Sequence, residues 1–125
     1  MAAKPEYKIQ KTVINYLSLF FPGALVAVSP AAGFRMSPGM AMKMVAMGYQ
    51  KGTPDLLILE PRGTFFGFFL EIKAPGGSLS DDQKRYMANA ARKGYAVDVA
   101  WSATEAIEKV SAYLSLPVHR AKHNT

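Results

Sequence analysis

Two carboxylates and a lysine stand in this sequence where they could carry out metal-assisted chemistry. Glu71 and Lys73 are two positions apart at the end of an apolar run, so in a strand both side chains leave the same face. Asp55 opens a second apolar run directly after Gly-Thr-Pro. Each has an ordinary explanation when taken alone, because a Glu-x-Lys pair often marks an exposed strand end and an aspartate often begins a turn. The chemistry therefore depends on whether the fold brings the three together.

The loop between the two apolar runs predicts that the carboxylates face each other. If residues 62–64 form a three-residue hairpin loop whose central glycine is left-handed, Pro61 pairs with Phe65 and Asp55 pairs with Glu71. Directly paired residues share a face, with Cα atoms about 4.5–5.5 Å apart. Two carboxylates that close repel each other unless a cation lies between them, and a hard divalent ion with oxygen ligands is the natural one. We therefore expect a Mg²⁺ or Mn²⁺ site.

Lys73 and three further polar residues are candidates for the same site. On the face that carries the carboxylates, Lys73 could orient a water molecule and stabilise the charge that develops on a phosphate. Glu6 and Gln10 extend an apolar helix stripe at a position where a core-facing helix would carry Leu or Ile, so both could point into a site. Glu6 could equally serve only the helix dipole. Gln83 follows Ser80 at the spacing of a capping box, which explains it without any catalysis.

The charge balance favours a polyanionic partner. The 125 residues carry 15 Lys and Arg against nine Asp and Glu, a formal net charge of +6, which suits nucleic acid but could serve solubility alone. The absence of cysteine excludes disulfides and thiolate chemistry, so any metal must be held by oxygen. No apolar stretch approaches the ~20 residues of a membrane helix, and the first six residues hold no signal-peptide core. We expect a soluble, intracellular (cytoplasmic) protein that does not contact membranes.

Hydrophobic periodicity and capping signals predict eight elements. The helices begin at Pro5, Ser37, Ser80 and Ser102 and are stopped by Pro22-Gly23, Gly48, Gly94 and Pro117, and the strands cover residues 25–29, 56–59, 65–72 and 95–101. The near-continuous apolar runs 56–59 and 65–72 are typical of strands covered on both faces. This order predicts an α/β fold with a central mixed β-sheet flanked by helices. We assign residues 1–117 to one domain and 118–125 to a flexible tail.

Residues 52–55 (Gly-Thr-Pro-Asp), 71–73 (Glu-Ile-Lys) and Gln83, in this order, resemble the PD-(D/E)XK nuclease superfamily, and the nearest branch is the VRR-Nuc domain. The resemblance covers almost the whole chain, beginning with Glu6 and Gln10. It implies the restriction-endonuclease-like fold and a nuclease that uses Mg²⁺ or Mn²⁺. It also matches Gln83 to a family glutamine close to the catalytic lysine.

The resemblance implies a role for each residue of the metal site. Asp55, Glu71 and the backbone carbonyl of Ile72 would be the ligands, and Lys73 would be the catalytic lysine. Glu6 would complete the metal site directly or through water.

The same resemblance implies a substrate. Family members that contain only this domain are similar to Holliday-junction resolvases and tend to be dimers, whereas members fused to larger proteins act on flaps as monomers. We therefore expect hydrolysis of branched DNA, four-way junctions first, leaving 5′ phosphates. A flap-selective nuclease, a non-catalytic nucleic-acid-binding module and a sequence-specific restriction-type enzyme are the alternatives. The binding module is disfavoured because it needs no carboxylate pair with a lysine, and the restriction-type enzyme because the chain has little room for a recognition domain.

Contacts to DNA are expected from Gln10 and from three basic residues between the first strand and Asp55, namely Arg35, Lys43 and Lys51. Taken singly, each basic residue is better explained as a solvated surface charge. Residues 31–34 (Ala-Ala-Gly-Phe) depart from related sequences, which often carry Asn or His there, and no role is assigned to them.

Two groups of apolar residues complete the expectations. We interpret Met40, Met44 and Met47, which share one face of the second helix, as core filling. Large aromatic side chains are numerous for one small core, which predicts that some lie on a homodimer interface: Phe65, Phe66, Phe68, Phe69, Tyr95, Trp101 and Tyr113. A four-way junction is two-fold symmetric, and a closed dimer offers two sites related by a matching axis. The alternative is that a two-sided sheet buries every aromatic within one subunit.

Overall fold

A four-stranded sheet runs through the protein in the order β1-β2-β3-β4. The computed structural model describes residues 3–29 and 31–118. The strands are β1 (Val26–Val28), β2 (Leu56–Ile58), β3 (Phe68–Ile72) and β4 (Ala96–Ala100). β2 is antiparallel to both β1 and β3, whereas β3 and β4 are parallel. The predicted mixed sheet is therefore confirmed, and most of the proposed flexible tail, residues 119–125, lies outside the described residues.

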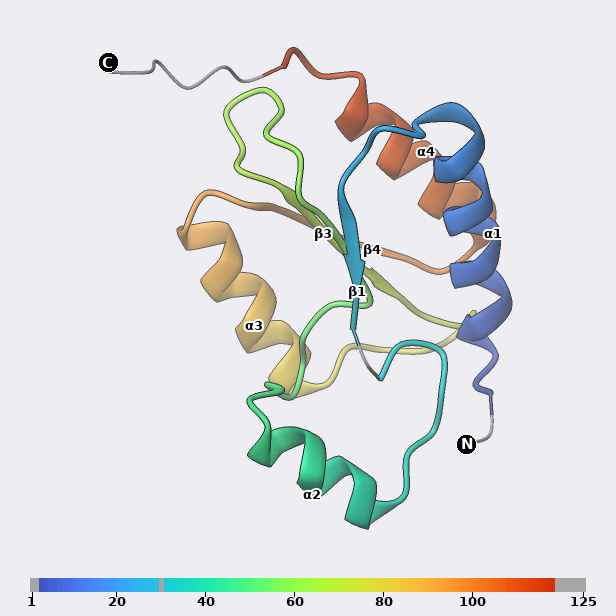
Figure 1. The fold of residues 1–125 in the computed structure, drawn as a ribbon, viewed down its shortest axis with the longest axis vertical. Coiled ribbons are helices and arrows are strands. Elements are labelled where there is room, and N and C mark those ends of the chain that lie inside the picture. The colour runs from blue at the N-terminus through green and yellow to red at the C-terminus, as the bar shows by residue number, and fades with distance from the viewer. Residues whose placement is uncertain (1–2, 30, 119–125) are drawn as a thin grey trace.

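Helices cover both faces of this sheet. They are α1 (Glu6–Phe20), α2 (Pro38–Ala46), α3 (Asp81–Arg92) and α4 (Ala103–Leu114). Figure 1 shows α1 and α4 side by side against one face of the sheet and α3 against the other, while α2 stands apart from the rest. Among the described residues, no helix has the length and apolar character that crossing a membrane requires.

β3 is buried along its whole length because it lies inside the sheet and between the helix layers. Phe68, Leu70 and Ile72 belong to the core cluster that includes residues of α1 and α4. Successive side chains of a strand alternate between faces, so Phe69 and Glu71 point to the α3 side. The strand therefore carries one carboxylate into the interior of the protein.

The β2–β3 hairpin has the predicted register in its strands but not at its tip. Leu56 pairs with Leu70 and Ile58 with Phe68, which places Asp55 opposite Glu71 as expected. At the tip, however, the isolated bridge joins Arg62 to Phe65, so the predicted Pro61–Phe65 pair is wrong. Three residues separate Ile58 from Arg62 but only two separate Phe65 from Phe68, and the extra residue shifts the register between the strands and the tip.

β3 also begins later than residue 65, because residues 65–67 belong to this irregular tip. Most of the large aromatic residues nevertheless pack within one subunit. Phe68 stacks on Tyr113 with ring centroids 5.1 Å apart, and Phe69 stacks on Tyr95 at 4.6 Å. Three members of the aromatic group remain exposed, namely Phe65, Phe66 and Trp101. The aromatic load therefore gives less support to an interface than the sequence suggested.

The interpretation of the α2 methionines as core filling is wrong. Met47 is 87% exposed and Met40 45% exposed, and no residue of the helix is buried. The helix forms for local reasons, since Ser37 accepts a hydrogen bond from the N–H of Met40 and Pro38 occupies the first turn. An apolar stripe shows that a helix could be buried, whereas burial itself requires a surface to lie against.

Candidate functional site

One small polar cavity gathers the carboxylates that the sequence singled out. It has a volume of about 70 Å³ and lies where the beginning of β2 and the last residues of β3 meet the starts of α1 and α3. The side chains and backbone that line it are those of Lys4, Glu6, Ser29, Ala31, Tyr49, Gly52, Thr53, Asp55, Glu71, Ile72, Lys73 and Gln83. Six of these are predicted site residues, and the lining as a whole comes from five separate segments of the chain.

Asp55 and Glu71 face each other at the open end of the β2–β3 pair. The backbone carbonyl of Asp55 accepts a hydrogen bond from Ser29 on the β1 side at 3.0 Å, which leaves its side chain beside Glu71. Asp55 Oδ2 accepts a hydrogen bond of 2.8 Å from the backbone N–H of Ile72. The aspartate therefore also closes the end of the hairpin, because it satisfies a strand N–H that has no ladder partner beyond Pro54.

Glu71 is the buried carboxylate of the cavity. Its side chain is only 2% exposed. Burial raises the pKa of the Glu71 carboxyl from 4.5 to about 9, helped by a hydrogen bond and by repulsion from Asp55, while Lys73 and Lys4 oppose the rise. In the absence of a cation, burial therefore favours the protonated form of the Glu71 carboxyl at neutral pH.

Gln83 contacts Glu71 and caps α3 at the same time. Its Oε1 accepts from the backbone N–H of Ser80 at 2.8 Å, and its backbone N–H donates to Ser80 Oγ at 3.1 Å, which completes the capping box. Its Nε2 donates to Glu71 Oε1 at 3.2 Å. The two interpretations of this residue are compatible, because the amide oxygen serves the helix and the amide nitrogen serves the site.

The donor set fits a hard divalent cation. Glu71 Oε2 is buried and has no hydrogen-bond partner within the described part of the chain. The carbonyl of Ile72 points to the same side of β3 as its N–H, toward Asp55. Two carboxylates and a carbonyl give oxygen ligands of the kind that Mg²⁺ and Mn²⁺ prefer. A cation between the carboxylates would also remove the repulsion that raises the pKa of Glu71.

Glu6 lines the cavity without joining the carboxylate pair. Residues 3–29 and 31–118 contain no group of three His, Cys, Asp or Glu side chains close enough to share one metal ion. Glu6 therefore lies near Asp55 and Glu71 at the start of α1 but does not form a third member of their cluster. Of the two implied roles, contact through water fits this placement better than direct ligation.

Lys73 and Lys4 bring positive charge to the cavity. The N–H of Lys73 donates to the carbonyl of Ala100 at 2.9 Å, so its backbone continues β3 and its side chain keeps to the face of Glu71. Sequence reasoning missed Lys4, which lines the same cavity. The backbone N–H of Lys4 donates to the carbonyl of Gly33 at 2.7 Å, which holds the segment ahead of α1 beside the loop after β1. No local pattern marks such a lysine, because its position depends on this long-range contact.

The expected DNA contacts lie in different places. Gln10 Nε2 donates to the backbone carbonyl of Asp55 at 3.4 Å, so this side chain helps to hold the site. Arg35, Lys43 and Lys51 are exposed and do not line the cavity that holds the carboxylates. Lys51 lines a neighbouring hollow against α3. DNA contact by these four residues stays a prediction.

The loop before β2 is packed tightly against the start of α3. Gly52 has a φ of +88°, and a Cβ atom there would lie 2.3 Å from the backbone oxygen of Asp82. Only glycine allows this approach. The contact places the first turn of α3, and with it Gln83, directly over the cavity.

Comparison with known proteins identifies the family of the chain. The family model described as VRR-NUC domain matches residues 25–104. A solved structure titled "VRR_NUC domain protein" is similar over 94% of this chain and 94% of its own, with 25% identity and a TM-score of 0.77. A second, titled "VRR_NUC domain", covers 89% of this chain and 99% of its own, with 24% identity and a TM-score of 0.59. No curated protein matches the chain. The expected α/β fold and the suggested family are both confirmed.

Replacing Gly52 by alanine should separate α3 from the site. The added methyl group must displace the backbone of Asp82, so we expect a loss of about 2–4 kcal/mol in the free energy of unfolding. Gly76→Ala is the matched control, since its φ is +82° and nothing lies within 4 Å of its added Cβ. It should lose only about 1 kcal/mol from backbone strain. Denaturant unfolding measures both losses, and equal losses would show that the close packing against α3 contributes nothing.

Glu71→Gln should stabilise the protein when no metal is present. The raised pKa means that the Glu71 contribution to stability is full below about pH 4.5 and is lost as the pH rises toward 9. Glutamine avoids this loss and can still donate to Asp55, so at pH 8 in EDTA the variant should gain about 1–3 kcal/mol. The gain should shrink toward pH 5, and the exposed Glu108→Gln should show none of it. A gain that grows toward low pH would contradict the burial of an uncompensated carboxylate.

Proposed function

The chain belongs to the VRR-NUC domain family of nuclease-type domains, and from that premise we propose that it is a Mg²⁺- or Mn²⁺-dependent endonuclease that cuts branched DNA. The observation that carries the proposal is the buried Glu71 opposite the half-buried Asp55, with one Glu71 oxygen that has no hydrogen-bond partner among the residues that the structure describes. A protein that only bound DNA would have no use for this pair, because its mutual repulsion destabilises the fold. A catalytic cation explains why the pair is retained.

The residues of the site divide the chemistry among them. Asp55, Glu71 and the Ile72 carbonyl would hold the cation, and Glu6 would act through water. When bound, such an ion neutralises phosphate oxygens and makes water a stronger nucleophile. Lys73 donates N–H groups to the attacking water or to a phosphate oxygen and so keeps the two in line. Gln83 fixes the Glu71 carboxylate through its 3.2 Å hydrogen bond and is a positioning residue.

The reaction is hydrolysis of a phosphodiester bond. Water attacks phosphorus, the bond to the 3′ oxygen breaks, and the products carry a 5′ phosphate and a 3′ hydroxyl. Lys4 also lines the cavity and adds a second positive charge near the expected position of the phosphate. The net charge of +6 and the exposed Arg35, Lys43 and Lys51 would attract the DNA backbone in a manner that weakens with salt.

Structure-selective cutting of a four-way junction would fit a homodimer. The exposed apolar residues of α2, which include Met42 at 74% and Met47 at 87% exposure, offer a surface that a second copy could cover. A two-fold dimer would present two sites to a two-fold junction. Selectivity for flaps by a monomer is the second candidate, and it is favoured by the fact that most of the aromatic group packs inside one subunit.

Substitutions should separate metal binding from catalysis. Asp55→Asn and Glu71→Gln should weaken Mn²⁺ binding and nearly abolish cutting, while DNA affinity without metal stays equal or rises because negative charge is removed. Lys73→Ala should keep Mn²⁺ binding and lose about 10²–10³-fold in rate. Calorimetry and single-turnover cleavage measure the two effects. Loss of Mn²⁺ binding in Lys73→Ala with normal binding in Glu71→Gln would reverse the assigned roles.

A panel of junction, flap and linear DNAs with Mg²⁺ should show the junction cut first. Sedimentation of the same protein at micromolar concentration should show a dimer. A single species near the 13.6 kDa chain mass, both free and with junction DNA, would exclude the dimer and move the substrate preference to flaps. Cleavage at one discrete site in plasmid DNA would instead indicate a sequence-specific enzyme.

A further inference from the structure

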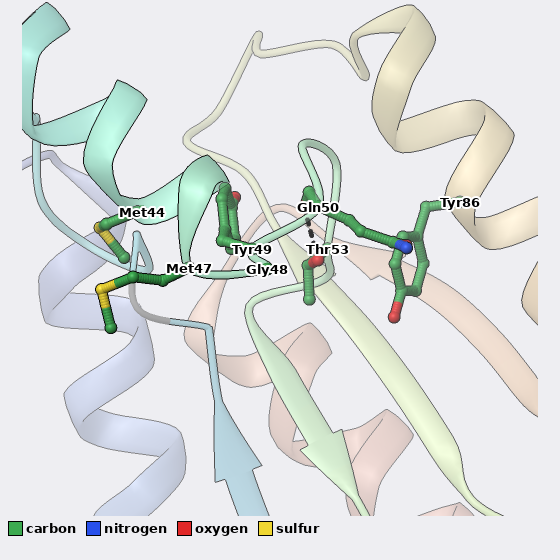
Figure 2. Close-up of a pocket in the computed structure, with 7 residues that line it drawn as sticks. All are labelled: Met44, Met47, Gly48, Tyr49, Gln50, Thr53 and Tyr86. Atoms are coloured by element: carbon green, nitrogen blue, oxygen red, sulfur yellow. Dashed lines mark hydrogen bonds between the residues drawn. The ribbon is translucent and has the colours of Figure 1, made fainter.

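A larger pocket adjoins the catalytic cavity and has no part in the chemistry described so far. It has a volume of about 500 Å³ and is lined by Met44, Met47, Gly48, Tyr49, Gln50, Thr53 and Tyr86. Figure 2 shows the two methionines at one end, Tyr86 of α3 at the other, and the loop residues Tyr49, Gln50 and Thr53 between them. A volume of about 300–1,000 Å³ is usual for sites that bind small organic groups.

The pocket is continuous with the catalytic cavity. Tyr49 and Thr53 line both. Two hydrogen bonds hold the loop between them in place. The backbone N–H of Tyr49 donates to the carbonyl of Met44 at 3.0 Å, and the Thr53 hydroxyl donates to the carbonyl of Gln50 at 2.6 Å. A group bound in the pocket would therefore lie next to a group bound in the cavity.

The lining combines flat apolar surfaces with a few polar groups. Tyr49 and Tyr86 offer aromatic faces, and the methionine side chains adapt to a flat ring. Gln50 carries an amide that can both donate and accept, and in the part of the chain that the structure describes this side chain makes no hydrogen bond. Figure 2 shows it extended toward the Tyr86 ring. These are the groups that bind nucleobases by stacking and by hydrogen bonds to the base edge.

We propose that this pocket receives one unpaired nucleobase of the strand whose phosphate lies in the catalytic cavity. The inference rests on the proposed function and names the part of the substrate that this second site recognises. Tyr86 is the principal stacking residue, since it lines the pocket from α3 and contributes nothing to the carboxylate site. Tyr49 forms the wall shared by the base and the phosphate.

The surface beyond the pocket suits the rest of a single strand. Gln50 and Tyr86 also line two adjoining hollows along α3, which include Lys51, Arg85 and Lys93. Arg85 pairs with Asp82, so part of its charge is already used. Aromatic faces alternating with basic side chains are the usual means of binding single-stranded nucleic acid.

The pocket would explain why the protein prefers branched DNA to a fully paired duplex. Taking a paired base out of a duplex costs free energy of unpairing and unstacking, whereas a base at a branch or in a single strand is already free. DNA with an unpaired nucleotide beside the cut would bind without this cost. Selection of branched DNA would then come from one subunit and would not require reading any base sequence.

Binding to DNA without metal tests the pocket independently of catalysis. In EDTA, 2-aminopurine is placed at successive positions near the branch of a flap or four-way junction, and its fluorescence is followed on titration with protein. We expect one position to change its fluorescence on binding, and we expect Tyr86→Ala to abolish that change. Tyr86→Phe keeps the aromatic face and should retain it. Tyr16→Ala is the matched control, because Tyr16 is a half-buried tyrosine of α1 that packs on Phe20 away from the pocket.

Cleavage with Mg²⁺ supplies the second readout. Removing the base at the responsive position should lower kcat/KM of the wild type about tenfold, and should have no further effect in Tyr86→Ala, because both changes remove one stacking contact. The inference is overturned if no position responds in EDTA, if the two losses add, or if Tyr86→Ala changes only self-association. A fluorescence response without any cleavage of the panel would support the pocket and contradict the proposed nuclease activity.

Discussion

The burial of one carboxylate opposite another is the constraint on which the rest of the site depends. Glu71 has almost no exposure and stands opposite the half-buried Asp55, so water cannot relieve a charge on Glu71. Every polar contact around the pair limits this cost: the Ile72 N–H donates to Asp55, and Gln83 donates to Glu71. Within the described residues, one buried oxygen of Glu71 is left without a partner. Such an oxygen supports the proposal of a cation site, since a protein selected for stability alone would place an apolar side chain there.

The contact between Gly52 and α3 positions the start of this helix relative to the carboxylates. Because a glycine without Cβ lets the backbone of the 49–53 loop touch Asp82, the start of α3 is held over the carboxylates. The same loop carries Tyr49 and Thr53, which line both the carboxylate cavity and the larger pocket. A single short loop therefore sets the distance between the two spaces. Under the proposed function, this geometry would let a small domain combine catalysis with substrate selection.

α2 shows a different use of apolar residues. Its cap and its proline make it helical without help from the core, and its methionines remain exposed beside the pocket. Methionine is flexible and polarisable, so an exposed Met-rich surface adapts to a partner more readily than a rigid one. The unusual feature of this helix is therefore an exposed apolar surface close to a polar cavity.

The amino-acid sequence by itself determined the local structure and the pairing of the carboxylates. The register expected from the sequence places Asp55 opposite Glu71, as observed, although the pairing expected at the hairpin tip is wrong and an extra residue restores the register in the strands. A one-residue slip of either strand would have turned its side chains to the other face. Ser80 and Gln83 likewise define the start of α3 from neighbouring residues alone. Only the tertiary structure decided that Glu71 is buried, that the Gln83 amide reaches it, that Lys4 lines the cavity, and that the α2 methionines are exposed. Periodicity and caps act between residues close in the chain, whereas burial and long-range contacts depend on which surfaces meet, and no local pattern contains that information.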